Sequence, residues 1–354
     1  MKKYVIIISF LLLFSSCKKE KQSITAQENK KIFTAVKVHT LLQEELSIRA
    51  ILIDENKVWY AANKGQFGFI DLQTDKRYNG HVTKDSLSLE FRSIAQTKEA
   101  IFLLNVGSPA LLYRVSKDGS QIKKVYEEKH EKVFYDSMHF WNSQEGIAMG
   151  DPTADCLSVL ITRNGGETWK KVSCESLPKI EEGEAAFAAS NTNIVINEEE
   201  AWMVSGGKKA RVFYSPDNGK SWNVYKTPIV QGEAMTGIFT ADFYDTKNGF
   251  IAGGNYEKPN QNFGNKAITQ DGGKTWKLIA ENDGFGYASC VQYVPNSNAQ
   301  QLVTVGASGL YYSSTSGEKW TQLGNDSTLF TIRFINDSTA IAAGKNKIVK
   351  LYFK

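Results

Sequence analysis

The sequence predicts an all-β fold, a β-propeller with seven blades, and three observations point to it. Residues 268–279 read ITQDGGKTWKLI, in which an Asp, two glycines and a Trp stand between apolar runs, a pattern typical of a tight hairpin. Related segments occur at 215–222, 162–169 and, less regularly, 313–320. Beyond its first 30 residues the chain also divides into segments of about forty to fifty residues, the period of a four-stranded propeller blade.

The repeated turn, an Asp box, is expected to be structural. Its Asp or Asn side chain can bond backbone amides of the turn, glycine supplies the positive φ, and the Trp packs beneath. Because such turns join the third and fourth strands of a blade, we expect them at the outer rim, away from the central channel. The residues assigned to this role are Asn164, Trp169, Asp217, Trp222, Asp271, Trp276 and Trp320.

The first thirty residues carry export features. Residues 1–16 have two lysines followed by an apolar run that is too short for a membrane span, and they predict a signal peptide. Small residues directly before Cys17 resemble a bacterial lipobox, so we expect cleavage there, lipidation of Cys17 and anchoring to a membrane of the bacterial cell envelope. Residues 17–30 are then a flexible tether and 31–354 the propeller. The alternative is an ordinary signal peptide in which Cys17 is incidental.

Seven segments follow in order, each opening with an apolar strand. They begin near residues 47, 91, 134, 185, 236, 287 and 329. The last segment has only three strands, whereas residues 31–38 (KIFTAVKV) form a strand without a segment. We therefore expect this N-terminal strand to supply the missing fourth strand and close the ring. The competing reading has six blades, with the first segment as a separate lead-in.

Composition excludes several classes of function. The net charge is +4, and the lysines form no basic stripe with stacking aromatics, which argues against nucleic-acid binding. The four histidines are scattered and there is no Cys-x-x-Cys, so no metal and no other cofactor is expected. Cys156 and Cys174 flank one turn almost symmetrically; a disulfide between them and buried free thiols, with Cys290, both remain open.

Ligands of propellers gather where the first strands and the loops between blades meet. The polar side chains that open the blades are Arg49, Arg92, Asp136, His139, Glu184 and Arg333, and Asp151 ends a second strand nearby. Three arginines facing one point would hold a carboxylate or another anion. Alternatively, they pair with Asp136, Asp151 and Glu184 and only plug the channel. We expect His139 to be packed rather than a base, and the insertion 255–265 to be a solvated loop.

Four strings carry a family resemblance: FYDSMHFW (134–141), GIAMGDP (146–152), GEAAFAAS (183–190) and GIF (237–239). With the Asp boxes, which resemble bacterial neuraminidase repeats, the chain resembles the photosystem II stability/assembly factor-like propellers. It is most similar to their exported lipoprotein relatives, which are often labelled oxidoreductases. The resemblance implies a seven-bladed propeller that binds a protein. No Gly-x-Gly-x-x-Gly follows a strand into a helix, so the oxidoreductase label finds no support in the sequence.

The functional prediction is a membrane-anchored, monomeric, non-enzymatic propeller that binds a protein partner or an anionic ligand at its channel mouth. The alternative is a glycosidase or lyase for acidic sugars, with Asp136, Asp151 or Glu184 as acid or base and the arginines as clamp. Sialidase activity would need a Phe-Arg-Ile-Pro motif, and residues 91–94 read FRSI instead.

Overall fold

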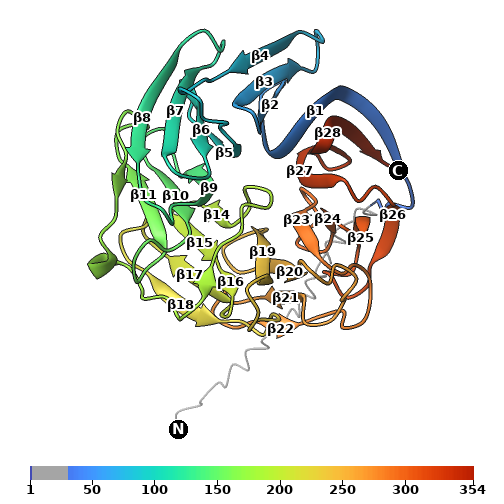
Figure 1. Ribbon diagram of the computed structural model, residues 1–354. Helices are drawn as coiled ribbons and strands as arrows, with labels where there is room; N and C mark the ends of the chain where they lie inside the picture. The colour runs from blue at the N-terminus through green and yellow to red at the C-terminus, as the bar shows by residue number, and fades with distance from the viewer. Residues whose placement is uncertain (2–30) are drawn as a thin grey trace. The chain divides into compact units, whose positions relative to one another are not determined.

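The computed structural model describes residue 1 and residues 31–354. Residues Ile32–Lys354 form one compact unit, in which β-sheets are arranged around a central axis (Figure 1). The predicted signal peptide, lipidated Cys17 and tether lie outside the described residues. The chain is therefore an all-β propeller, as predicted.

Most sheets contain four antiparallel strands. One consists of β5 (Phe91–Gln96), β6 (Ala100–Asn105), β7 (Ala110–Ser116) and β8 (Ile122–Glu128). The next consists of β9 (Tyr135–Phe140), β10 (Gly146–Gly150), β11 (Ser158–Thr162) and β12 (Lys170–Lys171). A third consists of β14 (Ile194–Asn197), β15 (Glu200–Val204), β17 (Arg211–Ser215) and β18 (Asn223–Lys226). A fourth consists of β23 (Ala288–Tyr293), β24 (Leu302–Gly306), β25 (Gly309–Ser313) and β26 (Thr321–Gly324).

Two sheets contain six strands. In one, the short strands β13 (Glu184–Ala185) and β16 (Gly206–Gly207) extend β19 (Thr236–Phe243), β20 (Gly249–Asn255), β21 (Lys266–Thr269) and β22 (Lys277–Leu278). The other runs in the order β27 (Leu329–Asn336), β28 (Thr339–Phe353), β1 (Val36–Asp54), β2 (Lys57–Ala62), β3 (Gln66–Asp71) and β4 (Arg77–His81). A single 3-10 turn, Cys174–Ser176, completes the elements of the described residues.

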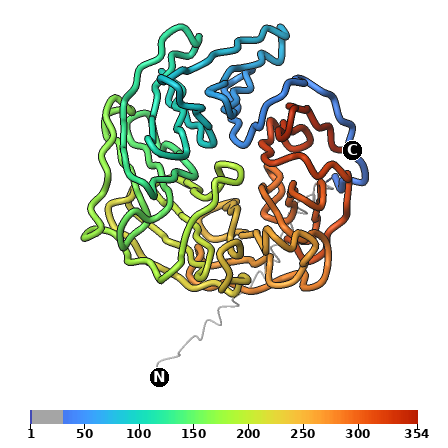
Figure 2. Tube along the Cα trace, in the orientation of Figure 1, coloured from blue at the N-terminus to red at the C-terminus, as the bar shows by residue number. Residues whose placement is uncertain are grey.

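The described strands thus form six hydrogen-bonded sheets and not the seven separate ones that the sequence predicts. The reason lies in β1, which pairs with β28 from Val36 to Ser47 and with β2 from Ile48 onward. The last and first predicted blades are therefore continuous. The expected pairing of the N-terminal strand with the C-terminal one is present, with Val36 opposite Phe353, and Figure 2 shows the blue and red ends of the ring side by side. The first segment is part of this sheet rather than a separate lead-in.

Second strands are buried on both faces because each sheet is packed between two others. All residues of β6, β10 and β20 are buried. Trp169 shows how the sheets join: its ring meets Phe102 of β6 and Phe140 of β9 edge to face, at centroid distances of 6.2 and 5.5 Å. This aromatic contact bridges two neighbouring sheets, the role that the sequence assigns to the repeated Trp.

The turn between β21 and β22 has the predicted hydrogen bonds. Asp271 Oδ1 accepts the backbone N–H groups of Lys274 and Thr275 at 3.1 and 2.9 Å, and its Oδ2 accepts the Thr275 hydroxyl at 2.6 Å. Gly273 has φ +84°, a conformation that glycine adopts without strain. Asp217 and Asn164 make the matching bonds in their own turns. The turns are therefore closed locally, at a distance from the channel.

Cys156 and Cys174 form a disulfide with Cα atoms 5.4 Å apart, while Cys290 is a buried free thiol. The bond joins Cys156, two residues before β11, to Cys174, the first residue of the 3-10 turn after β12. It fixes the start of the 174–184 loop, which leads to the centre of the ring.

Candidate functional site

The centre of the ring is crossed by residues 188–193, which lie between β13 and β14 and are called the plug below. Figure 2 shows this loop reaching the middle of the ring. The Asn191 amide donates to the Ile94 carbonyl of β5 at 2.8 Å, and its Oδ1 accepts the Met138 N–H of β9 at 3.0 Å. Hydroxyl groups of the plug bond β23 and β19 in the same way. The plug thus links innermost strands on different sides of the channel.

The plug separates two recesses that share no lining residue. The upper recess lies where the innermost strands begin, beside Arg49, Arg92 and Tyr287. The lower recess lies where the same strands end, beside residues such as Gln96 and Gln292. Along a strand, three to four residues span about 10 Å, so the two recesses open at opposite ends of the channel.

The upper recess is a cavity of about 430 Å³ with an aromatic wall. Phe187 stacks on Phe239 with ring centroids 3.9 Å apart and an angle of 6°. Tyr287 meets Phe239 edge to face at 4.8 Å, and Tyr256 meets Tyr287 edge to face at 5.2 Å. Tyr256, from the 255–265 insertion, is 48% exposed, so the wall continues to the surface. The insertion is therefore partly a wall of the recess and not only a solvated loop.

Arg49 and Arg92 lie together in the upper recess. Arg49 Nη1 donates to the Ala189 carbonyl of the plug at 3.2 Å, and its guanidinium lies 4.1 Å above the Phe330 ring. Burial, and then the nearby charge of Arg92, lower the pKa of Arg49. Arg92 forms a salt bridge with Glu90 at 2.6 Å, whereas Arg49 makes no salt bridge within the described residues. Arg49 is thus a cation that has no acidic partner in the described residues.

Two carboxyl groups lie beside these arginines. Asp151 lines the recess, accepts the Ala186 N–H at 2.8 Å, and has its pKa raised to about 6 by burial. Asp136 is fully buried, and neither of its oxygens has a hydrogen-bond partner within 31–354. Burial, and then the charge of Asp151, raise the pKa of Asp136 well above its usual value. Asp136 does not line the recess.

Glu184 serves a different purpose from the predicted ligand site. Its side chain has no exposure, and it accepts two bonds from the Arg211 guanidinium, one of 3.0 Å to Nε and one of 2.5 Å to Nη2. Ser205 donates a further bond to it. A bidentate, sealed ion pair of this kind holds β13 against β17. Of the three carboxyl groups proposed for acid or base catalysis, only Asp151 lines a recess.

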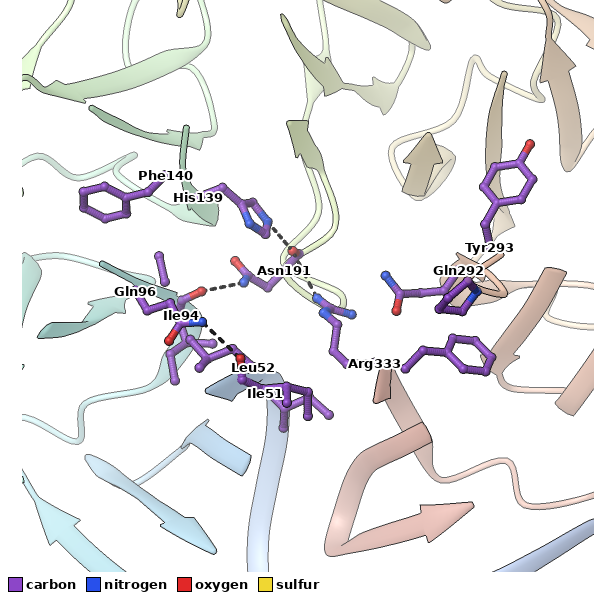
Figure 3. Close-up of a pocket in the computed structure, with 14 residues that line it drawn as sticks. Ile51, Leu52, Ile94, Gln96, His139, Phe140, Asn191, Gln292, Tyr293 and Arg333 are labelled. Carbon is purple, nitrogen blue, oxygen red and sulfur yellow. Dashed lines mark hydrogen bonds between the residues drawn. The ribbon is translucent and has the colours of Figure 1, made fainter. Parts of the chain in front are cut away.

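The lower recess consists of two adjoining cavities of about 440 and 380 Å³, which share His139, Phe140, Gln292 and Arg333 (Figure 3). His139 Nε2 donates to the Asn191 carbonyl at 3.0 Å, and Arg333 Nη2 donates to the same carbonyl at 3.4 Å. Burial lowers the pKa of His139 to about 4, so the imidazole is neutral. His139 is packed and hydrogen-bonded, the arrangement that the sequence favours.

The sequence predicts one cluster of arginines, and the structure divides it. Arg49 and Arg92 lie in the upper recess and Arg333 in the lower, with the plug between them. Among the described residues none of the three forms a salt bridge with Asp136, Asp151 or Glu184. The arrangement considered as an alternative, in which the arginines pair with these carboxyl groups, is not the one that the described residues form. The channel is closed by a backbone segment, whose carbonyls accept bonds from Arg49 and Arg333.

Sequence reasoning missed the aromatic wall, the plug and Gln292. Residues 183–190 stand out in the sequence as a string, but their course through the channel depends on contacts with five other sheets. One local sign was present, because Asn191 has φ +60°, a region in which Asn is enriched. The sequence around Gln292 has no feature that indicates a site. Gln292 lines the recess only because β23 ends there.

The part of the chain that the structure describes contains neither a metal-binding cluster nor a helix able to span a membrane. No group of three or more His, Cys, Asp or Glu side chains there has a metal-binding arrangement. In the same residues no helix combines the length and the apolar character that crossing a membrane requires.

No protein-family model matches the chain, and no curated protein matches it in sequence. Solved structures do match. The structure of YCF48 bound to D1 peptide aligns with TM-score 0.64 and 11% identity, over 91% of this chain and 98% of that chain. YCF48 from Cyanidioschyzon merolae aligns with TM-score 0.63 and 12% identity, over 90% and 98% of the two chains.

Other functions share this architecture. A streptogramin B lyase aligns with TM-score 0.67 and 14% identity, over 92% of this chain and 100% of that one. Because YCF48 and a streptogramin B lyase match about equally well at such low identity, the likeness establishes the β-propeller fold and not an activity.

Proposed function

We propose that the chain is a membrane-anchored, non-enzymatic β-propeller of the assembly-factor-like type, which binds a protein partner at the upper recess. The observation that carries this proposal is the pairing of Arg49, a cation without a salt bridge in the described residues, with a stacked aromatic wall that continues to the surface. Aromatic side chains and arginine are the residues that dominate protein interfaces.

The wall and the cation suit an extended segment of protein with apolar or aromatic side chains and an acidic group. The ring pairs offer flat apolar faces for side chains, and the Arg49 guanidinium offers forked donors for a carboxylate. The structural likeness to YCF48, whose structure contains a D1 peptide, supports a peptide as the class of ligand. Only one of the three candidate carboxyl groups lines the upper recess. Glycoside hydrolysis by an acid and a base needs two carboxyl groups, so this arrangement does not support it.

Site-specific crosslinking tests this function. A photoreactive phenylalanine would replace Tyr256 at the upper recess, in the full chain attached to its own membrane. The matched control replaces Ile122, which is also an exposed apolar side chain, at 41%, but lies on β8 at the rim. We expect a discrete protein adduct from position 256 that disappears when Arg49→Gln is added, and none from position 122. Equal adducts from both positions, or none from 256, would refute the proposal.

The anchor is a second part of the proposal. The lipobox-like residues before Cys17 support cleavage at this cysteine and its lipidation, and the tether would hold the recess near the membrane surface. Mass spectrometry of the N-terminal peptide of the native protein is the test. A diacylated Cys17 is the expected result, whereas an unmodified residue elsewhere at the mature start contradicts the anchor.

We also infer that the six-stranded sheet with β1 acts as two blades, which would give the ring seven. The support is the change of partner along β1 at Ser47 and the turn within β28, where Asn346 has φ +65° and the Phe353 N–H reaches the Ser338 carbonyl.

A further inference from the structure

The lower recess holds polar groups that the fold leaves unused. The Gln292 side chain has no hydrogen-bond partner in residues 31–354, although it lines both adjoining cavities. Figure 3 shows its amide directed toward the Arg333 guanidinium across the recess. A polar side chain placed in this way at the end of a buried strand is available to a ligand.

Arg333 supplies the positive charge of the recess. Its two terminal nitrogens donate to plug and strand oxygens, among them the Ile332 carbonyl at 2.7 Å and the Ser190 carbonyl at 3.1 Å. These bonds fix the guanidinium, and no bond from its Nε–H is found in the described part of the chain. Arg333 also forms no salt bridge there. The guanidinium is thus rigidly held, charged, and open to an anion through one N–H group.

His139 supplies an acceptor. Because Nε2 donates to the Asn191 carbonyl, the neutral ring carries its lone pair on Nδ1. Burial holds the pKa of the ring near 4, so Nδ1 stays unprotonated at neutral pH. Since His139 and Arg333 bond the same carbonyl, the acceptor and the cation lie side by side.

The acidic and apolar residues that line the lower recess restrict the class of ligand that it can bind. Asp242 is a half-buried acid of the recess, and it accepts the Tyr293 and Phe243 N–H groups. Burial raises its pKa to about 7, although these bonds and the nearby charge of Arg333 oppose the rise. Glu198 lines the second cavity but is exposed. Much of the remaining lining is apolar, with Phe140 the large aromatic side chain common to both cavities.

We propose that the lower recess binds a small hydroxycarboxylic acid with an apolar body, whose carboxylate is held by Arg333 and Gln292 and whose hydroxyl donates to His139 Nδ1. A carboxylate would neutralise the charge of Arg333 and accept hydrogen bonds from Arg333 and Gln292. A hydroxyl group would donate a hydrogen bond to the lone pair of His139 Nδ1. The apolar body packs on Phe140. This site is separate from the upper recess and does not depend on what binds there.

Three related compounds test the proposal on the purified full chain by isothermal titration or ligand-observed NMR. Mandelate has the carboxylate, the hydroxyl and an apolar ring; phenylacetate lacks the hydroxyl, and mandelamide lacks the charge. We expect mandelate to bind and each of the other two to bind roughly 10-fold more weakly, because phenylacetate loses the hydrogen bond to His139 and mandelamide loses the charge-assisted bond to Arg333.

Substitution of Gln292 places the binding in this recess. Because its side chain makes no bond in the described residues, Gln292→Leu and Gln292→Glu should fold with unchanged melting temperature. We expect about 10-fold weaker mandelate binding for Gln292→Leu and no detectable binding for Gln292→Glu, whose carboxylate repels the ligand. The matched control is Gln270→Leu, an exposed rim glutamine, with unchanged binding. Absence of mandelate binding at 10 mM of the probe, or wild-type affinity in Gln292→Glu, overturns the proposal.

Discussion

Asp151 allows a quantitative test of the electrostatics of the upper recess. Burial raises its pKa from 3.8 to about 6, while one hydrogen bond from the Ala186 N–H partly offsets the cost of ionisation. A carboxyl group with a higher pKa in the folded chain stabilises the fold below pH 3.8, and this contribution is lost as the pH rises through about 6. At about 1.4 kcal/mol per pH unit, the difference amounts to roughly 3 kcal/mol above pH 7.

Asp151→Asn removes this dependence and keeps the local bond. The amide oxygen still accepts the Ala186 N–H, and no charge is buried at any pH. We therefore expect the stability advantage of the variant over the wild type to be about 2 kcal/mol larger at pH 8 than at pH 4.5, where the Asp151 carboxyl is mostly protonated in the fold. The difference between the two pH values matters, because a constant cost of the amide cancels in it.

The assay is urea unfolding of both proteins at pH 8 and pH 4.5, with the full chain in each case. Asp75→Asn, an exposed substitution at the rim, is the matched control. If the advantage of Asp151→Asn is the same at both pH values, the carboxyl does not ionise at a cost in the fold, and the description of the upper recess as a desolvated site is wrong.

Three further substitutions and one titration test other parts of the structure. Asp271→Ala removes the acceptor of four turn bonds and should lower the free energy of unfolding by about 1–3 kcal/mol without changing binding in either recess, by urea unfolding and titration. Joint replacement of Cys156 and Cys174 by Ser should cost about 3 kcal/mol in the same unfolding assay, because the unfolded chain loses a cross-link over 18 residues. Asn191→Ala leaves buried strand groups without partners, and we expect a loss of about 2–4 kcal/mol together with weaker ligand binding in both recesses. Mandelate affinity should fall as the pH rises through about 7, since the Asp242 carboxyl then ionises beside the bound carboxylate; an unchanged affinity between pH 6 and 8 contradicts this placement of charge.

Local chemistry explains why the blade repeat was readable from the sequence. The hydrogen bonds that the Asp271 carboxylate accepts come from residues at most four positions away, so the motif forms its structure locally. The number of sheets depends instead on whether β1 breaks between its two partners. Register irregularities between Gln43 and Ser47 and between Ile48 and Ala50 flank this point, and they leave the strand continuous. No turn residue signals such a change, which is why seven separate sheets were expected.

The recess residues show the same division between local and long-range causes. Arg49 and Arg92 were predicted together because both open a first strand, and alternation along those strands places them at one mouth. Arg333 opens the last segment by the same reasoning, but it points to the other mouth. Its guanidinium donates hydrogen bonds to the plug carbonyls of Ser190 and Asn191, which lie more than 140 positions away in the sequence. These bonds fix the direction of the side chain. The sequence pattern predicts which polar residues line the channel. Contacts with the plug determine at which end of the channel each of these side chains lies.

The plug therefore has a role beyond filling space. If the channel were open, Arg49, Arg92 and Arg333 would face one continuous cavity, and their mutual repulsion in a desolvated space would be unfavourable. Backbone carbonyls of the plug accept bonds from two of the three, at Ala189 and Ser190, and so satisfy donors without neutralising the charges. An ion-pair plug would have cancelled the charges at both mouths. A channel closed by backbone carbonyls leaves a cation on each side that is not paired with the carboxyl groups of the plug alternative, and this is the physical basis for two separate recesses in one ring.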